Sequence, residues 1–315
     1  MSDKIKNNIF ISIIFTVIVY LALSFYGNVN LVLESLQEFK WKYFPIILLV
    51  FFFTFLLKFI KWQYYLKFLD VKVQFIISFK IFMASLVMSV TPGKIGDLIK
   101  SYMLKEVNGT PVNISIPIVF AERVTEFVAL LILVILGVNI YNQNILILSI
   151  SLLSIIVLFI ILFNSRITNS IISKLSKSKK LEKYIEPLSL TLSNSKSLLQ
   201  PKPFLLMVLF SLFIWIIESF GFYLILAQFN IDISIIWTFF AYLFSVFIGS
   251  VSMLPAGLGV TDGSLTYLIT QNGFSKEIAV SATLIVRIAT LWFALIIGII
   301  GMFGFDKISK NKTKK

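Results

Sequence analysis

The sequence predicts an all-α polytopic membrane protein, with about six full crossings and two re-entrant broken hairpins arranged as an inverted-topology repeat. Hydrophobic residues make up 58% of the 315 positions, and the mean hydropathy is +0.95, whereas soluble domains contain about 45–50% apolar residues. Windows such as 9–23, 44–57 and 204–227 carry few or no charges, and roughly 20 apolar residues suffice to span a bilayer. Two segments rich in proline and glycine interrupt this pattern: "SVTPGKIGDLIKSYML" (89–104, the first knot) and "SMLPAGLGVTDGSLTYLI" (252–269, the second knot).

The positive charges are distributed unevenly among the loops. Of the 28 Lys and Arg residues, 23 fall in four groups: two before the first apolar window, eight from Lys58 to Lys105, eight from Arg166 to Lys202, and five in the tail. The positive-inside rule places these groups, and both termini, on the cytoplasmic side of a cell membrane. Attraction to anionic lipid headgroups explains the net charge of +13 without a nucleic-acid partner. The cytoplasmic lysines are therefore interpreted as topology signals.

The first membrane half is predicted to cover residues 1–163. The apolar stretch that leads into its first knot, 76–90, is too short to cross a membrane comfortably, and the segments on both sides of the knot start and finish in basic sequence. It is therefore expected to enter and leave from the cytoplasm. The other elements, in order, are an outward helix at 9–27, an external loop at 28–43, a returning helix at 44–66, an outward helix at 114–138 and a returning helix at 145–163.

The second membrane half is predicted to cover residues 203–305. A Lys/Ser-rich cytoplasmic linker, 164–202, precedes it and could form a short amphipathic surface helix, and a basic cytoplasmic tail, 306–315, follows it. The second knot should enter from the outside, because its short connecting loops carry little positive charge. Its neighbours are expected to be an outward helix at 204–227, knot arms at 235–253 and 262–273, and a last helix at 278–304.

The two halves are related in sequence. Pro92 and Gly96 of the first knot match Pro255 and Gly259 of the second at an offset of 163 residues. At an offset of 164, "FAERVTEFVALLILVILG" (120–137) aligns with "LIVRIATLWFALIIGIIG" (284–301). This alignment matches Arg123 with Arg287, the two arginines that lie within apolar segments. The charge distribution gives the halves opposite orientations. Broken helices at matching positions of an inverted repeat are typical of transporter folds.

The knots predict a polar cavity near the middle of the membrane. Non-helical backbone at that depth is tolerated only where it is buried in protein or lines a wet cavity. Proline blocks the helix and glycine permits positive φ angles. The helices that restart at Ile95 and Thr261 would then offer free N–H groups to an anion. The residues expected in the re-entrant turns are Pro92, Gly93, Gly96, Pro255, Gly257, Gly259 and Gly263.

Charged residues near the knots are the candidate substrate-binding groups. Arg or an acidic residue at the centre of a bilayer costs at least about 2.5–3.5 kcal/mol, so such residues usually mark function. We expect the cations to bind a phosphate and the carboxylates to hold the cations in place or to exchange with the substrate. Arg123 and Glu126, at i,i+3 on one helix, can form such a pair. The alternative is a set of structural ion pairs, in which the two aspartates cap the restarting helices. The candidates are Arg123, Arg287, Lys94, Glu122, Glu126, Glu218, Asp97 and Asp262.

The composition argues against an enzyme. The chain has no Cys and no His, which removes thiolate chemistry and the commonest metal ligand and general base. No Asp-x-Asp motif and no Asp-rich phosphotransferase signature occurs in the sequence. We therefore expect no catalytic residues, no metal and no cofactor.

Four segments resemble the membrane region of the lysyl-phosphatidylglycerol synthases: "TPGKIGDLIKSYMLK", "PIVFAERVTEFVALLIL", "LPAGLGVTDGSLTYLI" and "RIATLWFALIIG". Stand-alone relatives of that region occur widely in bacteria and archaea. The family's knots often carry Glu just past the glycines, where this chain has Asp97 and Asp262. This departure keeps the charge and changes the reach of the carboxylate.

The resemblance implies a flippase that moves an aminoacylated phospholipid between leaflets. A separate soluble domain of the family loads the amino acid, and this chain is expected to lack it. The substrate would be a membrane lipid with an anionic headgroup, such as an aminoacyl-phospholipid or a polyprenyl-phosphate carrier. The alternatives are a secondary transporter of a small anion, a membrane transferase, or a scaffold for a separate lipid-modifying enzyme. The sequence leaves the lipid, the coupling ion and the oligomeric state open.

Overall fold

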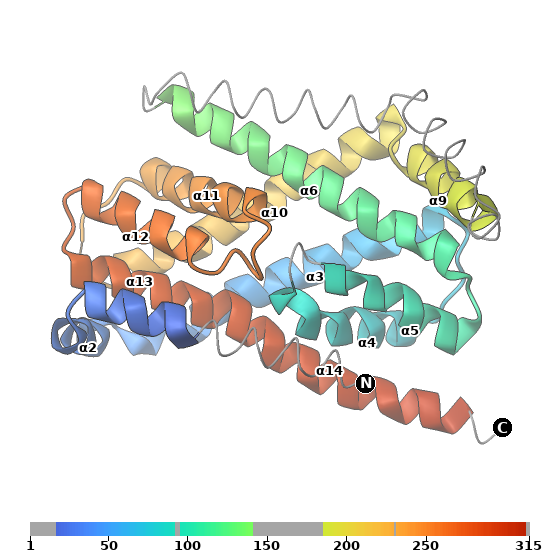
Figure 1. Ribbon diagram of the computed structural model, residues 1–315, viewed down its shortest axis with the longest axis horizontal. Helices are drawn as coiled ribbons and strands as arrows, with labels where there is room; N and C mark the ends of the chain where they lie inside the picture. The colour runs from blue at the N-terminus through green and yellow to red at the C-terminus, as the bar shows by residue number, and fades with distance from the viewer. Residues whose placement is uncertain (1–16, 92–94, 141–184, 230, 313–315) are drawn as a thin grey trace.

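The computed structural model describes residues 17–91, 95–140, 185–229 and 231–312, and all regular structure within them is helical (Figure 1). The helices are Val17–Tyr26, α2 (Val29–Glu38), α3 (Phe44–Phe68), α4 (Phe75–Ser85), α5 (Ile99–Asn108), α6 (Val112–Ile140), α9 (Ile185–Leu198), α10 (Pro201–Ala227), α11 (Ile235–Val251), α12 (Val260–Gln271), α13 (Lys276–Arg287) and α14 (Phe293–Lys312). Short 3-10 turns lie at Trp41–Tyr43, Leu86–Val90 and Ile95–Leu98, and a π-helical turn lies at Ile288–Trp292.

Several of these helices are suited to cross a membrane. Within the described residues, three are long and apolar enough: Trp41–Phe68, Pro201–Ala227 and Lys276–Phe305. Val17–Tyr26 and Val29–Glu38, which meet at an angle of 95°, make a fourth if they count as one span. The chain is thus an all-α protein with several membrane helices, while the crossing expected at 145–163 lies outside the described residues.

The expectation of an external loop at 28–43 is wrong, because most of this segment is helical. Asn28 has a φ of 63°, which turns the chain, and its side chain accepts a hydrogen bond from the backbone N–H of Asn30 at 3.2 Å. The helix α2 that follows buries Val32 and packs on α13, where the hydroxyl of Ser281 donates to the carbonyl of Val32. A short amphipathic helix with a capping residue therefore replaces the loop.

Both knots break their helices as the sequence predicts. In the first, α4 gives way at Ser85 to a 3-10 turn, and helical structure restarts at Ile95 before α5 begins. In the second, α11 ends at Val251 and α12 begins at Val260. Four residues of the second knot have positive φ angles: Met253, Ala256, Gly257 and Gly259.

α4 and the 3-10 turn Leu86–Val90, which lead into the first knot, pack directly on α14 along the lower edge of Figure 1. Gly298 and Gly301 of α14 make this approach possible. A Cβ atom at Gly298 would lie 2.2 Å from the backbone nitrogen of Val87, and one at Gly301 would lie 2.5 Å from that of Ala84. On the other side of the molecule, α11 packs between α6 and α10. α14 thus covers α4 of the first half, and α6 covers α11 of the second half.

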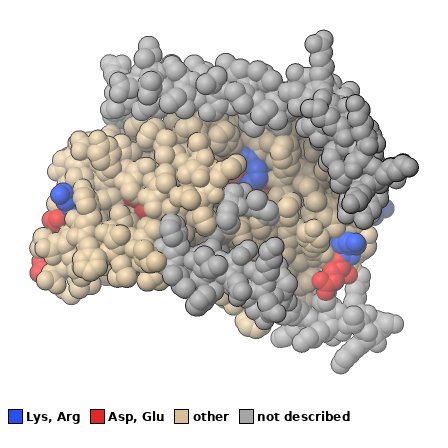
Figure 2. Space-filling view, viewed as in Figure 1, with Lys and Arg blue, Asp and Glu red and all other residues tan. Residues whose placement is uncertain are grey.

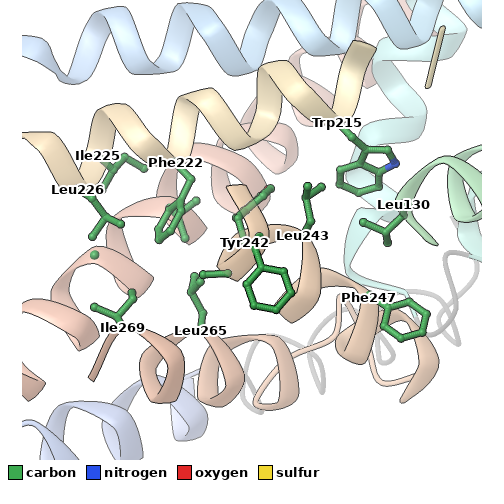
Figure 3. Close-up of a cluster of buried hydrophobic side chains, with 14 of the residues drawn as sticks. Leu130, Trp215, Phe222, Ile225, Leu226, Tyr242, Leu243, Phe247, Leu265 and Ile269 are labelled. Atoms are coloured by element: carbon green, nitrogen blue, oxygen red, sulfur yellow. The ribbon is translucent and has the colours of Figure 1, made fainter. Parts of the chain in front are cut away.

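A hydrophobic core holds the second knot in place. Figure 3 shows side chains of α10, α11 and α12 converging with Leu130 of α6. The rings of Phe222 and Tyr242 stack with their centroids 5.4 Å apart, and Leu265 and Ile269 close the cluster from α12. Dense packing of this kind fixes where polar groups of the same helices can lie.

The linker and the last helix differ in detail from the sequence-based expectation. Residues 185–198 of the expected linker form α9, which packs on α6, while 164–184 lie outside the described residues. The last helix, expected at 278–304, runs from Lys276 to Lys312 and contains a π-helical turn directly after Arg287. Such turns are frequent at functional sites.

Candidate functional site

Four cations and four carboxylates gather where α3, α5, α6 and α10 meet. This central charge cluster consists of Lys58, Lys61, Asp97, Lys100, Glu122, Arg123, Glu126 and Glu218. Every member takes part in an ion pair with another member, and the formal charges cancel. Six of the eight side chains are less than 15% exposed.

Arg123 is the most accessible cation of the cluster. Its Nη2 lies 3.0 Å from Oδ2 of Asp97, and its Nη1 lies 2.9 Å from Oε2 of Glu126, the i,i+3 partner that the sequence predicts. The side chain is 29% exposed, yet its Nε is buried and has no hydrogen-bond partner among the described residues. Figure 2 shows basic surface in the middle of a mostly uncharged face, in the region that α6 crosses. Arg123 thus has one buried N–H donor to which no described residue is bonded.

Lys100 and Glu122 form a deeply buried pair. The Nζ of Lys100 lies 2.5 Å from Oε2 of Glu122, and both side chains are almost fully excluded from solvent. The same ammonium lies 4.7 Å from the ring centroid of Trp62 and 5.4 Å from that of Phe82. Aromatic faces and a carboxylate together compensate the lost hydration of the lysine.

Two lysines of α3 connect the cluster to α10 in the second half of the chain. Lys58 pairs with Glu218 at 2.5 Å. Lys61 donates to the hydroxyl of Ser211 at 2.7 Å and lies 3.9 Å from Oε1 of Glu126. Helices from both halves therefore share one polar network across an otherwise apolar contact.

The interpretation of the lysines as topology signals is wrong for three of them. Lys58, Lys61 and Lys100 point into the protein and pair with carboxylates. The sequence does contain a signal: two lysines at i,i+3 in "LLKFIKWQYY", with apolar and aromatic residues on both sides. A lysine in such surroundings is costly unless a carboxylate lies within reach, which makes it a candidate for a buried ion pair.

Arg287 and Asp262 form a second site, which clamps the second knot. The Nε of Arg287 donates to Oδ1 of Asp262, while Nη1 and Nη2 donate to the carbonyls of Ala256 and Gly257 at 3.1 and 3.5 Å. Oδ2 of Asp262 accepts from the backbone N–H of Gly259 at 2.8 Å, so this aspartate also caps α12. All three nitrogens of the Arg287 guanidinium are therefore occupied by the protein.

The two arginines do not share partners in the described part of the chain. The sequence predicts that Arg123, Arg287 and Lys94 meet one phosphate, but each arginine is bound to its own aspartate, and Lys94 lies outside the described residues.

The glycines of the knots have different roles. In the first knot, the N–H of Gly96 donates to the hydroxyl of Thr91 at 2.9 Å, and a Cβ atom at Gly96 would lie 2.5 Å from that of Met88. In the second, Gly257 and Gly259 have φ angles of 65° and 80°, which favour glycine. A Cβ atom at Gly263 would meet nothing within 4 Å. Pro255 lies in the middle of this loop, between α11 and α12, while Pro92 and Gly93 lie outside the described residues.

The cluster consists of charges that are paired with one another. Among the described residues, no group of three or more acidic side chains is arranged to hold a metal ion. An open hollow of about 630 Å³ lies beside the end of α3, lined among others by Lys67, Asp70 and Lys72, and it contains no residue of the cluster.

Comparison with known proteins gives one family and two similar proteins. The family model "Lysylphosphatidylglycerol synthase TM region" matches residues 9–298. The UPF0104 membrane protein MJ1078 of Methanocaldococcus jannaschii is 27% identical over 233 residues, which cover 72% of this chain and 96% of that protein. A UPF0104 membrane protein of Methanothermobacter thermautotrophicus is 31% identical over 106 residues, which cover 33% of this chain and 31% of that protein.

Proposed function

This chain belongs to the family of the lysylphosphatidylglycerol synthase TM region, and from this we propose that it moves a phosphate-headed lipid between the leaflets of a membrane. The substrate class includes aminoacyl-phospholipids and polyprenyl phosphates. The observation that carries the proposal is Arg123, a partly exposed guanidinium with an unused buried donor inside a charge-neutral cluster. The protein acts by binding and moving the lipid, without chemical conversion.

The phosphate of the headgroup is bound by Arg123. A guanidinium holds a phosphate through two parallel hydrogen bonds, which a lysine cannot reproduce. Asp97 and Glu126 hold the guanidinium in position before the lipid arrives. Arg287 is the less suitable ligand, because its three nitrogens are already bonded to Asp262 and to the backbone of the second knot.

The translocation pathway is formed by two inverted halves with six crossings. The order of elements supports this arrangement, since α3, α4, α5 and α6 recur as α10, α11, α12 and the α13–α14 helix. The offset of 164 residues that aligns the arginines also aligns the first residue of α6, Val112, with that of α13, Lys276. It aligns Gly109 after α5, with a φ of 79°, with Gly273 after α12, with a φ of 91°.

Alternating access follows from the contact between the halves. Lys58–Glu218 and Lys61–Ser211 join α3 to α10 beside the headgroup site. Polar pairs between two bodies can exchange partners as the bodies rock against each other. The lipid tails stay in the bilayer while the headgroup passes along the cluster. The protein lies in the cell membrane with both termini cytoplasmic, and its basic linker could contact a separate lipid-modifying enzyme.

The test is leaflet exchange in proteoliposomes that contain the purified protein. The probes are fluorescent phosphatidylglycerol, its lysyl ester and a short polyprenyl phosphate. Protein-dependent exchange of at least one probe is expected, and Arg123→Gln should abolish it. Lys202→Gln, which removes an exposed cation at the start of α10, is the matched control and should exchange lipid like the wild type. Absence of exchange in folded protein, together with uptake of inorganic phosphate, would favour a small-anion transporter instead.

A further inference from the structure

The charge balance of the central charge cluster restricts what can bind there. Its four cations and four carboxylates cancel, and the ion pairs lie mostly out of contact with solvent. A phosphate diester adds one negative charge. Uncompensated charge in such surroundings is strongly disfavoured. An anionic headgroup therefore needs a cation that enters with it.

The unpartnered Nε of Arg123 indicates which carboxylate a bound phosphate would displace. In a guanidinium, Nε and Nη2 point their hydrogens along one edge, which is the edge that binds two oxygens side by side. In Arg123, Nε is unpartnered among the described residues, while Nη2 bonds Asp97 and Nη1 bonds Glu126. A phosphate that uses this edge replaces Asp97 and leaves Glu126 in place. In Arg287, the corresponding edge is filled by Asp262 and the carbonyl of Gly257.

We propose that the protein takes up one proton for each net-anionic headgroup that it binds, and that the displaced carboxylate of Asp97 accepts this proton. The inference rests on the proposed function, and it makes the movement of an anionic lipid proton-coupled. In the step, the hydrogen bond between Nη2 and Asp97 breaks, the phosphate oxygens accept from Nε and Nη2, and an Oδ atom of Asp97 gains a proton from water. The net charge of the cluster is the same before and after.

The surroundings of Asp97 favour it over the other carboxylates as the acceptor. Glu122 keeps Lys100 and Glu218 keeps Lys58, each at 2.5 Å, and Glu126 keeps Arg123. Arg123 is the one cation whose pairing with Asp97 the described part of the structure records.

Among the described residues, the elements that pack against the turn of Asp97 provide no second cation that is paired with it. These elements are the 3-10 turn Leu86–Val90, α5 and α6. The turn Leu86–Val90 has no titratable side chain, and Lys100 of α5 is bound to Glu122. On α6, Glu126 is itself acidic and Arg123 is taken by the phosphate. Asp97 is also 13% exposed, so a proton can reach it.

Calorimetric proton counting tests the proposal. Binding of dihexanoyl phosphatidylglycerol to the purified full-length protein is measured in two buffers with different ionisation enthalpies. The wild type should take up about one proton per lipid, and its affinity for the lipid should fall by up to about tenfold for each unit by which the pH rises. Lysyl-phosphatidylglycerol should bind with almost no uptake, because its ammonium groups can pair with the released Asp97.

Asp97→Asn isolates the acceptor. This variant should bind phosphatidylglycerol without proton uptake and with an affinity that no longer depends on pH. Glu34→Gln, which removes an exposed carboxylate of α2, is the matched control and should keep the uptake of the wild type. If Asp97→Asn does not fold, the number of protons that the wild type takes up per bound lipid still tests the proposal.

Two outcomes would overturn the proposal, and they are distinguishable. Wild-type protein that binds phosphatidylglycerol without proton uptake, including binding that needs Na⁺ instead, contradicts proton coupling while the lipid site stands. Wild-type protein that binds none of the lipids at any pH contradicts the proposed function itself.

Discussion

Arg123 on α6 pairs with Asp97 of the first knot, with 3.0 Å between Nη2 and Oδ2. Arg287 and Asp262 repeat this relationship at the second knot. The two pairs differ in how much of the guanidinium remains free. Arg123 keeps an unpartnered Nε within the described structure, whereas Arg287 also bonds two backbone carbonyls. The two arginines thus differ in their surroundings: Arg287 holds the loop of the second knot, whereas Arg123 has the unpartnered donor on which the proposed ligand site is based.

Arg287→Gln should destabilise the protein far more than Arg123→Gln. Its loss leaves Asp262, which is fully buried, without a counter-ion and frees the carbonyls of Ala256 and Gly257. Breaking a buried pair from one side costs about 3–5 kcal/mol. Loss of Arg123, which is 29% exposed, leaves Asp97 13% exposed and therefore in partial contact with water. Thermal unfolding of the detergent-solubilised variants measures the difference.

A second substitution checks the reason for this loss. Adding Asp262→Asn to Arg287→Gln removes the unpaired negative charge and should recover part of the stability. A double variant no more stable than Arg287→Gln alone would assign the loss to the carbonyls of the knot.

Gly298→Ala should be strongly destabilising, because the new Cβ would lie 2.2 Å from the backbone nitrogen of Val87. Two packed helices would have to separate, and overpacking of this kind typically costs about 1–3 kcal/mol. Gly263→Ala is the control in α12, where a Cβ meets no atom within 4 Å. Thermal unfolding should show a clear loss for the first variant and little change for the second. Equal behaviour would contradict the close approach of α14 to the first knot.

Much of the helical arrangement could be predicted from the sequence, because apolar length and helix breakers act locally. The helix expected at 44–66 is α3, and both knots interrupt their helices where proline and glycine occur. Residues 28–43 were harder to predict, because α2 is stabilised by packing on α13, far away in the sequence.

The candidate site was predicted only in part, for a similar reason. The pair Arg123–Glu126 lies within one helix and follows from its i,i+3 spacing. The partners of Glu122 and Glu218 come from other helices, at sequence separations of 22 and 160 residues. Apolar and aromatic neighbours make Lys58 and Lys61 candidates for buried ion pairs, but nothing local identifies the distant carboxylate that each lysine reaches. The free Nε of Arg123 depends on this same tertiary pairing.

The pair Lys58–Glu218 should be needed for transport more than for stability. Glu218→Gln alone leaves a poorly hydrated lysine without its partner and should lower the unfolding temperature. The double variant Lys58→Met, Glu218→Met should recover most of that stability, because apolar residues can replace a buried ion pair. If the pair exchanges partners as the halves move, leaflet exchange should remain slow in the double variant. Wild-type exchange rates there would make the pair purely structural.

Corresponding loops of the two halves should face opposite sides of the membrane. The chain has no Cys, so single cysteines can be introduced without background. Lys105 on α5 and Lys276 at the start of α13 are both exposed and lie near the corresponding glycines Gly109 and Gly273. In intact cells, a membrane-impermeant thiol reagent should label the Lys276→Cys variant. It should label the Lys105→Cys variant only after the membrane has been permeabilised.

The exposure of both sites makes either result of this labelling informative. Because each side chain is solvent-accessible in the structure, protection of one cysteine reports the membrane barrier and not burial. Labelling of both cysteines from the same side would contradict the inverted repeat, since the two halves would then share one orientation. Labelling from opposite sides would support it independently of the charge distribution, which matters because Lys58, Lys61 and Lys100 pair with carboxylates and are not topology signals alone.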